Sequence, residues 1–452
     1  MKFLAMLALS FFFIYGCSNI QPPLMTSKLL LGENNRISGY YNINTTWWTK
    51  FNDRQLNKIM SIAINNNENL LISSTNIRKS LYQANLLRSN LLPDISAFSS
   101  INMKKYENQR NEDTTSFTSE GMINYEIDIW HKLSDSSFSG KLEYHATVED
   151  YYAAQLTLIN SVIDSYFYLT YLNSAINAIN DKIKYYDELV KKTQIKLYYG
   201  KVSSFDLQKS MQSLLSARQS YFLLQQERYE FQQNLNNFLN IRSENLHWIK
   251  FPNILSCKTH KIDLNIPLSV LANRPDVKSA EYRFKKCFYD TIAVEKELYP
   301  SITIDFGISS SEAMNTSLNF PIYVANIKLN LPFLNWNKIK WNIKISELDY
   351  NIAKIKFEAI INTALNELNF AYSNYKNAVE SYKNSSNLYK ADVKIENYYR
   401  LRYENGSNDI TDWLSAAAAS TDTKLNMLKN YFEVIKYEVM IYKAMAGEYT
   451  LK

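Results

Sequence analysis

The stretch YEIDIWHKL at residues 125–133 returns as LPFLNWNKI at residues 331–339, and this repetition decides the fold. Three landmarks recur in the same way: Trp130 with Trp336, Gly200 with Gly406, and Pro93 with Pro300. The first two pairs are 206 positions apart and the third pair is 207 apart. Self-similarity at one spacing is the signature of a repeated structural unit. The sequence therefore predicts two copies of one unit.

The two copies share one order of elements. We place a first repeat at residues 53–250 and a second at 268–452, joined by a linker at 251–267. Each repeat is expected to begin with a helix, at 53–92 and 275–299. Strand hairpins follow at 94–130 and 300–336, and pairs of long helices at 131–245 and 337–447. The predicted fold is mainly α, with four strands per chain.

The long helices are predicted from the scarcity of glycine and proline. The 452 residues include only nine of each, so the chain has few of the residues that break helices. From Trp130 to Gly200, and from Trp336 to Gly406, is 70 residues, and ~1.5 Å per residue gives a helix of roughly 100 Å. Glycine suits the left-handed residue that ends a helix, so Gly200 and Gly406 are predicted as the turns where the chain reverses. A plain coiled-coil rod would fit this part of the sequence equally well.

Alternation of apolar and polar residues marks the hairpins as strands. In the second hairpin, Tyr323, Ile327 and Leu329 share one face, while Asn326 and Lys328 share the other. The charged residues of the strands all fall on the polar face: Glu126, Asp128, Asp305 and Lys328. A hairpin that covers a soluble core would show the same alternation.

A transmembrane barrel explains these strands better. Strands of about 9 to 11 residues cross a bilayer, and in lipid only helices and closed barrels satisfy every backbone group. Beyond the N-terminal segment, the sequence has no apolar run of the length that a transmembrane helix requires. Four strands cannot close a barrel alone, so three copies are expected to supply twelve. The four charged strand residues would then face the lumen.

The N-terminus is predicted to direct export. Residues 1–16 resemble a signal peptide, because Lys2 precedes an apolar run that is too short to span a bilayer. The run ends before Cys17, in a pattern similar to a bacterial lipobox. Cleavage would make Cys17 the acceptor of a covalent lipid, and residues 17–52 would be a lipid-anchored extension in the outer membrane. An ordinary secretory signal with an incidental cysteine is the alternative.

Acidic residues follow both glycine turns. Ser203 or Ser204 is predicted to cap the helix after the first turn, and Asp409 the helix after the second. Asp206 and Asp412 would then lie in the first helical turn, where a carboxylate interacts favourably with the helix N-terminus. The second interpretation is a ring of carboxylates around a narrow tunnel entrance, created by symmetry between copies.

Other functional classes have little support in the sequence. The net charge of +6 is spread along the chain, so no nucleic-acid partner is expected. The four histidines lack the spacing of metal ligands, and we find no nucleophile or phosphate-binding motif, so we expect no catalysis, metal or cofactor. Cys257 and Cys287 have no matching histidines; two free thiols are the simplest expectation, and a disulfide stays open.

The landmarks together resemble the TolC-like outer-membrane efflux channels, in particular the lipoprotein branch that serves resistance-nodulation-division pumps. The matching stretches are YEIDIW at 125–130, ANRPDV at 272–277, LPFLNW at 331–336, and Arg402 through Gly406 to Asp412. The resemblance covers essentially the whole mature chain, in order. It implies a homotrimer with a twelve-stranded barrel in the outer membrane and a helical tunnel in the periplasm. It also implies two partners, a periplasmic adaptor and an inner-membrane pump.

The resemblance also assigns residues to a periplasmic gate. Asp412 falls on the first acidic position of the family pattern, Ser415 stands at the second, and Asn408 stands at a basic position. The implied function is passive conduction of small molecules from the periplasm to the outside. Two alternatives stay open: a type I protein-secretion channel of the same fold, and a structural coiled-coil lipoprotein.

Overall fold

The computed structural model describes residues 41–105, 114–241, 249–260, 262, 268–313 and 321–451. The described residues form two compact units. The first, which we call the strand unit, contains 75–150 and 278–360. The second, which we call the helix unit, contains the described residues of 41–74, 151–277 and 361–451. Each unit contains segments from both repeats. Cys17 and the predicted signal peptide lie outside the described residues.

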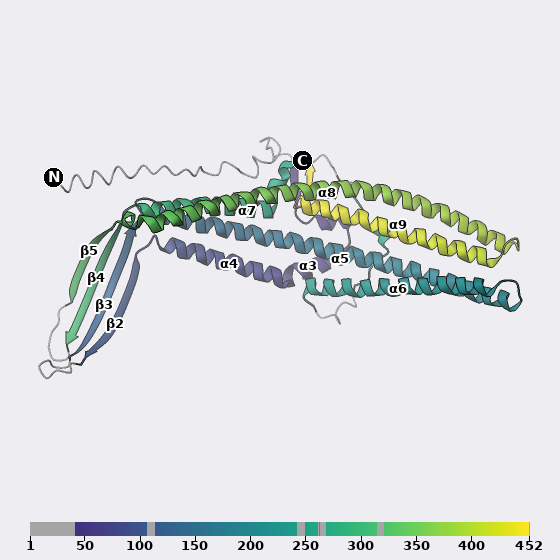
Figure 1. The fold of residues 1–452 in the computed structure, drawn as a ribbon, viewed down its shortest axis with the longest axis horizontal. Coiled ribbons are helices and arrows are strands. Elements are labelled where there is room, and N and C mark those ends of the chain that lie inside the picture. The colour runs from purple at the N-terminus through teal and green to yellow at the C-terminus, as the bar shows by residue number, and fades with distance from the viewer. Residues whose placement is uncertain are drawn as a thin grey trace. The chain divides into compact units, whose positions relative to one another are not determined.

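The strand unit contains one antiparallel sheet with the order β2-β3-β4-β5 (Figure 1). Its strands are β2 (Asp94–Lys104), β3 (Thr114–Ile127), β4 (Ser301–Ala313) and β5 (Ile322–Asn330). The two predicted hairpins are therefore confirmed, and β3 pairs with β4 to join them. β2 and β5 form the two edges, and neither pairs along its outer side with another described strand.

Strand register shows how closely the two repeats match. Asp94 pairs with Asn124 in the first hairpin, and Ser301 pairs with Asn330 in the second. Adding 207 to the residue number in β2 and 206 to the residue number in β3 converts the first of these pairs into the second. These are the same two separations that the landmark residues gave. The repeat is thus preserved in backbone pairing as well as in sequence.

The helices of the strand unit repeat in the same way. They belong to α4 (Glu68–Ser89), α5 (Lys132–Tyr198), α7 (Pro275–Glu295) and α8 (Trp336–Glu404). In the first repeat α5 approaches α4 so closely that a Cβ on Gly140 would lie 3.3 Å from the Ala84 Cα. In the second repeat the equivalent residues are Ser346 and Thr291, and the Thr291 hydroxyl donates to the Ser346 carbonyl oxygen over 3.1 Å. The same positions therefore join the first helix to the long helix in both copies.

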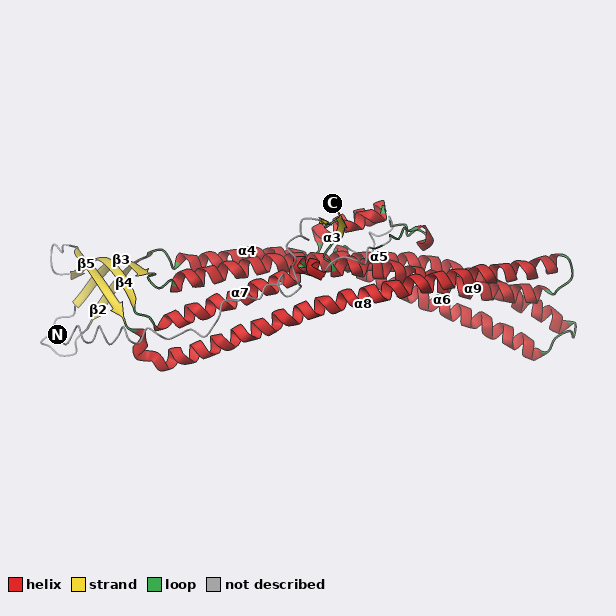
Figure 2. Ribbon diagram, turned by 90° about the horizontal axis from the view of Figure 1, so that it is seen from above, coloured by secondary structure: helices red, strands yellow, loops and turns green. Residues whose placement is uncertain are grey.

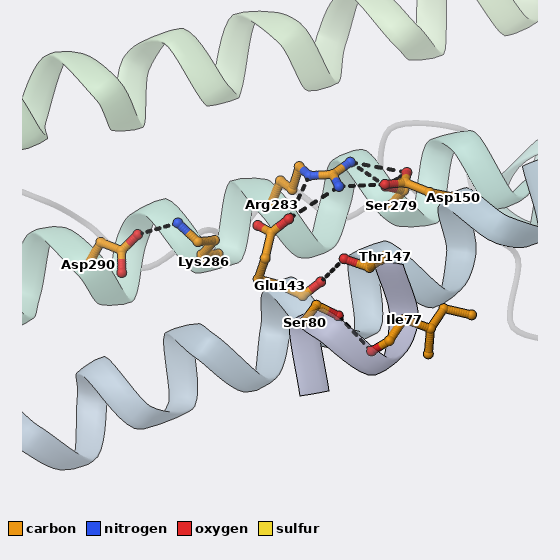
Figure 3. A network of polar contacts seen from close by, with 9 residues as sticks. All are labelled: Ile77, Ser80, Glu143, Thr147, Asp150, Ser279, Arg283, Lys286 and Asp290. Atoms are coloured by element: carbon orange, nitrogen blue, oxygen red, sulfur yellow. Dashed lines mark hydrogen bonds and ion pairs between the residues drawn. The ribbon is translucent and has the colours of Figure 1, made fainter. Parts of the chain in front are cut away.

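The α5 and α7 helices are held together by charged residues (Figure 3). Arg283 of α7 donates to Asp150 Oδ2 over 2.5 Å and to Glu143 Oε1 over 3.2 Å. Ser279 also donates to Asp150 over 2.5 Å. Further contacts continue toward the strands, from Ser139 to Asp290 and from Lys296 to Asp135. Ion pairs and charged hydrogen bonds therefore form part of this interface inside the chain.

The helix unit contains two long helical hairpins. α5 continues to Tyr198 and reverses into α6 (Ser204–Leu239), and α8 continues to Glu404 and reverses into α9 (Ile410–Ala444) (Figure 2). The unbroken long helices confirm the prediction. The predicted first helix at 53–92 is wrong, because the structure has two helices there, α3 (Arg54–Asn66) and α4. Asn67 separates them, with extended backbone and a side chain that accepts from the Leu70 N–H.

The segment before the first repeat is an ordered part of the helix unit. β1 (Tyr41–Asn44) pairs with β6 (Glu448–Leu451), so the two ends of the described chain meet in a small sheet. A short 3-10 helix, Trp47–Phe51, follows β1. Trp47 is buried and stacks on Tyr442 of α9 with a centroid distance of 4.9 Å. This part of the predicted extension is therefore anchored by packing.

Candidate functional site

Both reversals of the long helices have the predicted glycine geometry. Gly200 and Gly406 have φ of 66° and 69°, in the left-handed region that side chains disfavour. The Lys201 N–H bonds the Lys196 carbonyl over 2.8 Å, and the Ser407 N–H bonds the Arg402 carbonyl over the same distance. This is the Schellman ending of a helix, and it occurs in both repeats at equivalent residues.

After the first turn, Asp206 is committed to a capping box. The Ser203 side chain accepts from the Asp206 N–H, and Asp206 Oδ2 accepts from the Ser203 N–H over 2.9 Å. The Ser203 hydroxyl also donates to Asp206 over 2.7 Å. These bonds from Ser203 lower the pKa of Asp206 below its usual value. Asp206 therefore stabilises the start of α6, which is the simpler of the two predicted roles.

After the second turn, Asp409 caps α9 and also forms an ion pair. Its side chain accepts from the Thr411 N–H over 2.8 Å, as predicted for a helix cap. The Lys196 ammonium, from the last turn of α5, forms an ion pair with the same carboxylate. Burial opposes the charged form, but Lys196 and Thr411 together lower the pKa of Asp409. The first repeat thus contacts the second at this end of the helix unit.

A second ion pair lies further along the same two helices. Lys182 of α5 pairs with Asp422 of α9. Sequence reasoning missed both lysines, because each lies more than 200 residues from its partner. A weak signal existed for Lys196, since a cation in the last turn of a helix is favourable for that helix alone. We call the Lys196–Asp409 and Lys182–Asp422 pairs the latch.

Asp412 and Ser415 remain exposed on α9. Asp412 Oδ2 accepts from the Asn408 side-chain amide over 3.0 Å. Asn408 stands where the family resemblance implies a basic residue, so this contact is a neutral hydrogen bond to a carboxylate. Of the predicted gate carboxylates, Asp412 is the one whose charge is not used in a cap or in the latch. Its place in a ring stays a prediction.

Three of the four predicted lumen residues lie on one face of the sheet. Asp305 is buried, accepts from the Asn124 amide over 2.7 Å, and pairs with Lys328 over 2.5 Å. Glu126 pairs with Lys132 over 2.6 Å. Register places Glu126 beside Thr303, and Thr303 beside Lys328. Their exposure to a lumen stays a prediction.

The assignment of Asp128 to a strand is wrong. β3 ends at Ile127, and Asp128 lies in the turn before α5. Its carboxylate accepts from the Leu133 N–H over 2.9 Å and from the Ser134 N–H over 2.8 Å. Asp128 satisfies N–H groups at the start of a long helix, which have no partner inside the helix. The alternation in sequence continued past the point where the strand ends.

A buried carboxylate outside the predicted sites fixes the linker to α9. Glu438 is fully buried, and its oxygens accept from the His260 N–H over 3.2 Å and contact His260 Nδ1 at 3.0 Å. Burial raises the pKa of Glu438 to about 8. Nothing in the sequence pattern distinguished this glutamate from the other charged residues of α9. Its bonds hold the linker segment that ends at His260 against the helix unit.

The described residues contain no group of three or more His, Cys, Asp or Glu side chains that could hold a metal ion. Cys257 and Cys287 are both free thiols, and burial raises the pKa of each, that of Cys257 to about 11. No helix in the described part of the chain combines the length and apolar character needed to cross a bilayer.

Comparison with known proteins agrees with this architecture. The model of the outer membrane efflux protein family matches residues 59–240 and again residues 266–447. The two matches coincide with the two repeats. The toxin and drug export protein A of Aggregatibacter actinomycetemcomitans is 34% identical over 97% of this chain and 96% of its own length. The probable outer membrane lipoprotein SilC of Salmonella typhimurium is 22% identical over 98% of each chain.

Solved structures share the fold. The CmeC outer membrane channel of Campylobacter jejuni superposes with a TM-score of 0.79 at 21% identity, covering 90% of this chain and 88% of CmeC. Together, the doubled family match and the near-complete coverage of its relatives show that this chain belongs to the outer membrane efflux protein family, the outer-membrane channel components of tripartite efflux systems.

Proposed function

We propose that three copies of this chain form one gated channel that conducts small molecules passively from the periplasm to the outside. The observation that carries the proposal is a four-stranded sheet that is apolar on one face, polar on the other, and open at both edges. Three such sheets supply twelve strands, which can close into a barrel without edges.

The apolar face suits lipid. Cross-strand rows on this face join Ile127 to Ile302, Tyr125 to Ile304, and Ile123 to Phe306. The ten steps from Ile127 to Phe117 span roughly 33 Å along the strand. A tilt of about 40° reduces this to about 25 Å, the height of the apolar band of outer-membrane barrels. Ile304, Phe306 and Ile308 are exposed in the single chain, as residues that face lipid would be.

The gate is assigned to the end of the helix unit that carries the two glycine turns. Opening requires α9 to move relative to α5, so the latch would break, and Asp412 would line the entrance. An adaptor that binds the open arrangement more tightly would shift this equilibrium without any energy input from the channel. No residue of this chain is assigned a catalytic role.

The proposal also includes a lipid anchor in the membrane and two partner proteins. Cys17 would carry the lipid that adds to the anchoring by the barrel, since stable attachment needs more than one membrane signal. A periplasmic adaptor and an inner-membrane pump would deliver the cargo. Export of a protein is the second candidate, because a relative with 34% identity is named for the export of both toxin and drug.

Planar-bilayer conductance tests the gate assignment. We compare the wild-type protein with Asp412→Ala, and use Asp206→Ala as the matched control. The proposal predicts small wild-type currents that increase in Asp412→Ala and are unchanged in Asp206→Ala. Equal currents in all three proteins would move the gate away from Asp412. An absence of current from inserted protein would contradict the channel itself.

A further inference from the structure

We propose that Glu438 and His260 form a proton-controlled clasp, which docks the linker between the two repeats onto the helix unit. The clasp holds while the pair keeps a proton between Glu438 Oε1 and His260 Nδ1, and it loosens when rising pH removes that proton to solvent. The inference is independent of the proposed channel, because it needs only contacts within one chain. It identifies a pH-sensitive conformational device in the helix unit.

Most of the bonds that hold the linker do not titrate near neutral pH. The described part of the linker before this clasp, residues 249–259, is bonded to α5 and α9. The Ser174 hydroxyl of α5 accepts from the Ile254 N–H over 3.0 Å, and the Tyr431 hydroxyl of α9 donates to the Cys257 carbonyl over 2.5 Å. Burial raises the pKa of Tyr431 to about 12, so both hydroxyls stay neutral.

At His260 the linker meets a titratable group instead. Glu438 of α9 has no exposed surface, and both of its carboxyl oxygens accept from the His260 N–H at 3.2 Å. Its Oε1 also lies 3.0 Å from His260 Nδ1. A carboxylate oxygen and an unprotonated ring nitrogen are both acceptors, so a contact this short requires a proton between them. The Tyr375 hydroxyl of α8 donates to the His260 carbonyl over 3.0 Å and holds this residue from the other side.

The charged neighbours of the pair leave Glu438 without a counter-ion. Lys50, from the 3-10 helix before α3, influences Glu438 but forms its ion pair with Glu448 of β6. Lys258 of the linker influences His260. The other titratable groups that face Glu438 are phenols of α8 and α9: Tyr375, Tyr431 and Tyr442. In the part of the chain that the structure describes, His260 is the one basic residue within ion-pair distance of Glu438.

Burial therefore decides the charge of the pair. A carboxyl group taken out of water without a cation favours its neutral form, and burial raises the pKa of Glu438 to about 8. Burial, together with Lys50 and Lys258, lowers the pKa of His260. At neutral pH the pair is thus a protonated carboxyl group that donates to a neutral imidazole. Once that proton leaves, a buried carboxylate remains without a cation, which favours release of the linker and entry of water.

The two pKa shifts define the pH range of the response. In the undocked linker, Glu438 and His260 meet water and return to their ordinary pKa values of 4.5 and 6.5. Up to about pH 8 the docked state keeps a proton on Glu438 that the undocked state has already lost. Docking therefore weakens by about 10-fold between pH 6.5 and 8 and levels off above this range. Below pH 6.5 the undocked His260 gains a proton, and this offsets the effect of Glu438.

Hydrogen exchange of the linker amides tests the clasp. Exchange of residues 249–260 in the full-length protein is measured by mass spectrometry, for the wild type and for Glu438→Gln, which keeps the acceptor for the His260 N–H but cannot ionise. Dividing the wild-type rate by the variant rate at each pH removes the intrinsic pH dependence of exchange. We expect this ratio to rise by about 10-fold from pH 6.5 to 8.

Glu433→Gln is the matched control. It makes the same substitution on α9 at a partly exposed carboxylate that has no bond to the linker within the described residues. The ratio of the wild-type rate to the rate of this variant should stay constant over the same pH range. A constant ratio for Glu438→Gln as well would overturn the clasp, because a carboxyl group with a purely structural role gives no pH-dependent difference.

His260→Ala provides a second test that does not depend on the folding of Glu438→Gln. The variant keeps the backbone N–H that binds Glu438 but loses the imidazole, and with it the offset below pH 6.5. Its linker should dock more tightly as pH falls from 6.5 to 5.5, so the ratio of its exchange rate to the wild-type rate should fall several-fold. An equal ratio at both pH values would contradict the role of His260 and overturn the clasp.

Discussion

α5 and α8 occupy the same place in the two repeats, yet equivalent residues near the strands differ in how far they are buried. On α5, Glu143 and Asp150 bind the Arg283 guanidinium of α7, and Ser139 and Leu142 are buried. On α8, the equivalent face presents exposed Ile345 and Leu348. The backbone arrangement repeats, while the burial of equivalent side chains differs. Where a residue is exposed in one repeat, the neighbours that bury its counterpart in the other repeat indicate what kind of surface could cover it.

The two turns show the same divergence at the opposite ends of these helices. Gly200 and Gly406 reverse the chain with identical geometry. Asp206 is then confined to its own helix by Ser203, whereas Asp409 reaches across to Lys196 of the other repeat. The second repeat therefore carries the contact that must break if the helices separate. Asp409, whose carboxylate bonds outside its own helix, is therefore the candidate residue for the control of channel opening.

The largest expected effect follows from breaking the apolar face of α8. Ile345→Asp/Ile352→Asp would bury two carboxylates without partners, at a cost of several kcal/mol each. We expect folded monomers and no trimers by light scattering. Lys354→Asp is the control, because it introduces a carboxylate on a different face of α8 and should leave the trimer intact. Trimers in the double variant would show that this face is not an interface.

Removing the Lys196–Asp409 pair of the latch should increase channel opening. An exposed ion pair is worth about 0.2–1 kcal/mol, and Lys196→Ala removes three per trimer, so the equilibrium constant for opening should rise by about 3- to 160-fold. Single-channel recording gives the open probability. Lys191→Ala provides the comparison, because within the described part of the chain Lys191 pairs with Asp187 and Glu188 of its own helix. A latch without a role in gating would give the same open probability in both variants.

The latch also predicts the direction of pH dependence. The pKa of Asp409 is lowered in the folded protein, so its contribution to the closed state is present above the usual carboxyl pKa of about 4 and is lost as pH falls through the lowered value. Open probability should therefore be constant between pH 7 and 5 and rise below about pH 4. Lys196→Ala should flatten this rise. A steep change in open probability near neutral pH would assign the control of opening to another titratable group.

A smaller effect is expected from exchanging residues between the repeats. Gly140→Ser installs the residue that the second repeat carries at Ser346, whose backbone carbonyl accepts from the Thr291 hydroxyl. In the first repeat Ala84 and Leu87 crowd the site, so overpacking should lower the free energy of unfolding by about 1–3 kcal/mol. Thermal unfolding measures this loss, and Ser346→Gly should show no such clash. Equal stability of both variants would mean that the two helix contacts are interchangeable.

Local patterns in the sequence predicted much of the molecule. The strands, the glycine turns and the caps at Ser203 and Asp409 each depend on neighbouring residues, and the structure confirms them. Asp128 was misplaced because apolar alternation continues through Ile129, while the strand ends where helix capping begins. The break at Asn67 has no glycine or proline to mark it.

Contacts between distant segments could not be predicted in this way. Lys196 and Asp409 lie in separate repeats, and only folding brings the end of α5 to the start of α9. Glu438 is one of many charged residues until its burial against His260 is seen. The burial of Asp305 between Asn124 and Lys328 also depends on the pairing of three strands. In each case the partner is set by tertiary structure.

The most direct test of a channel built from three chains is the number of chains in the particle that carries current. Full-length protein is purified, its mass is measured by light scattering, and the same fraction is inserted into a planar bilayer. We expect the conducting fraction to contain three chains. Conduction by single chains, or inserted three-chain particles that carry no current even with Lys196→Ala, would contradict it.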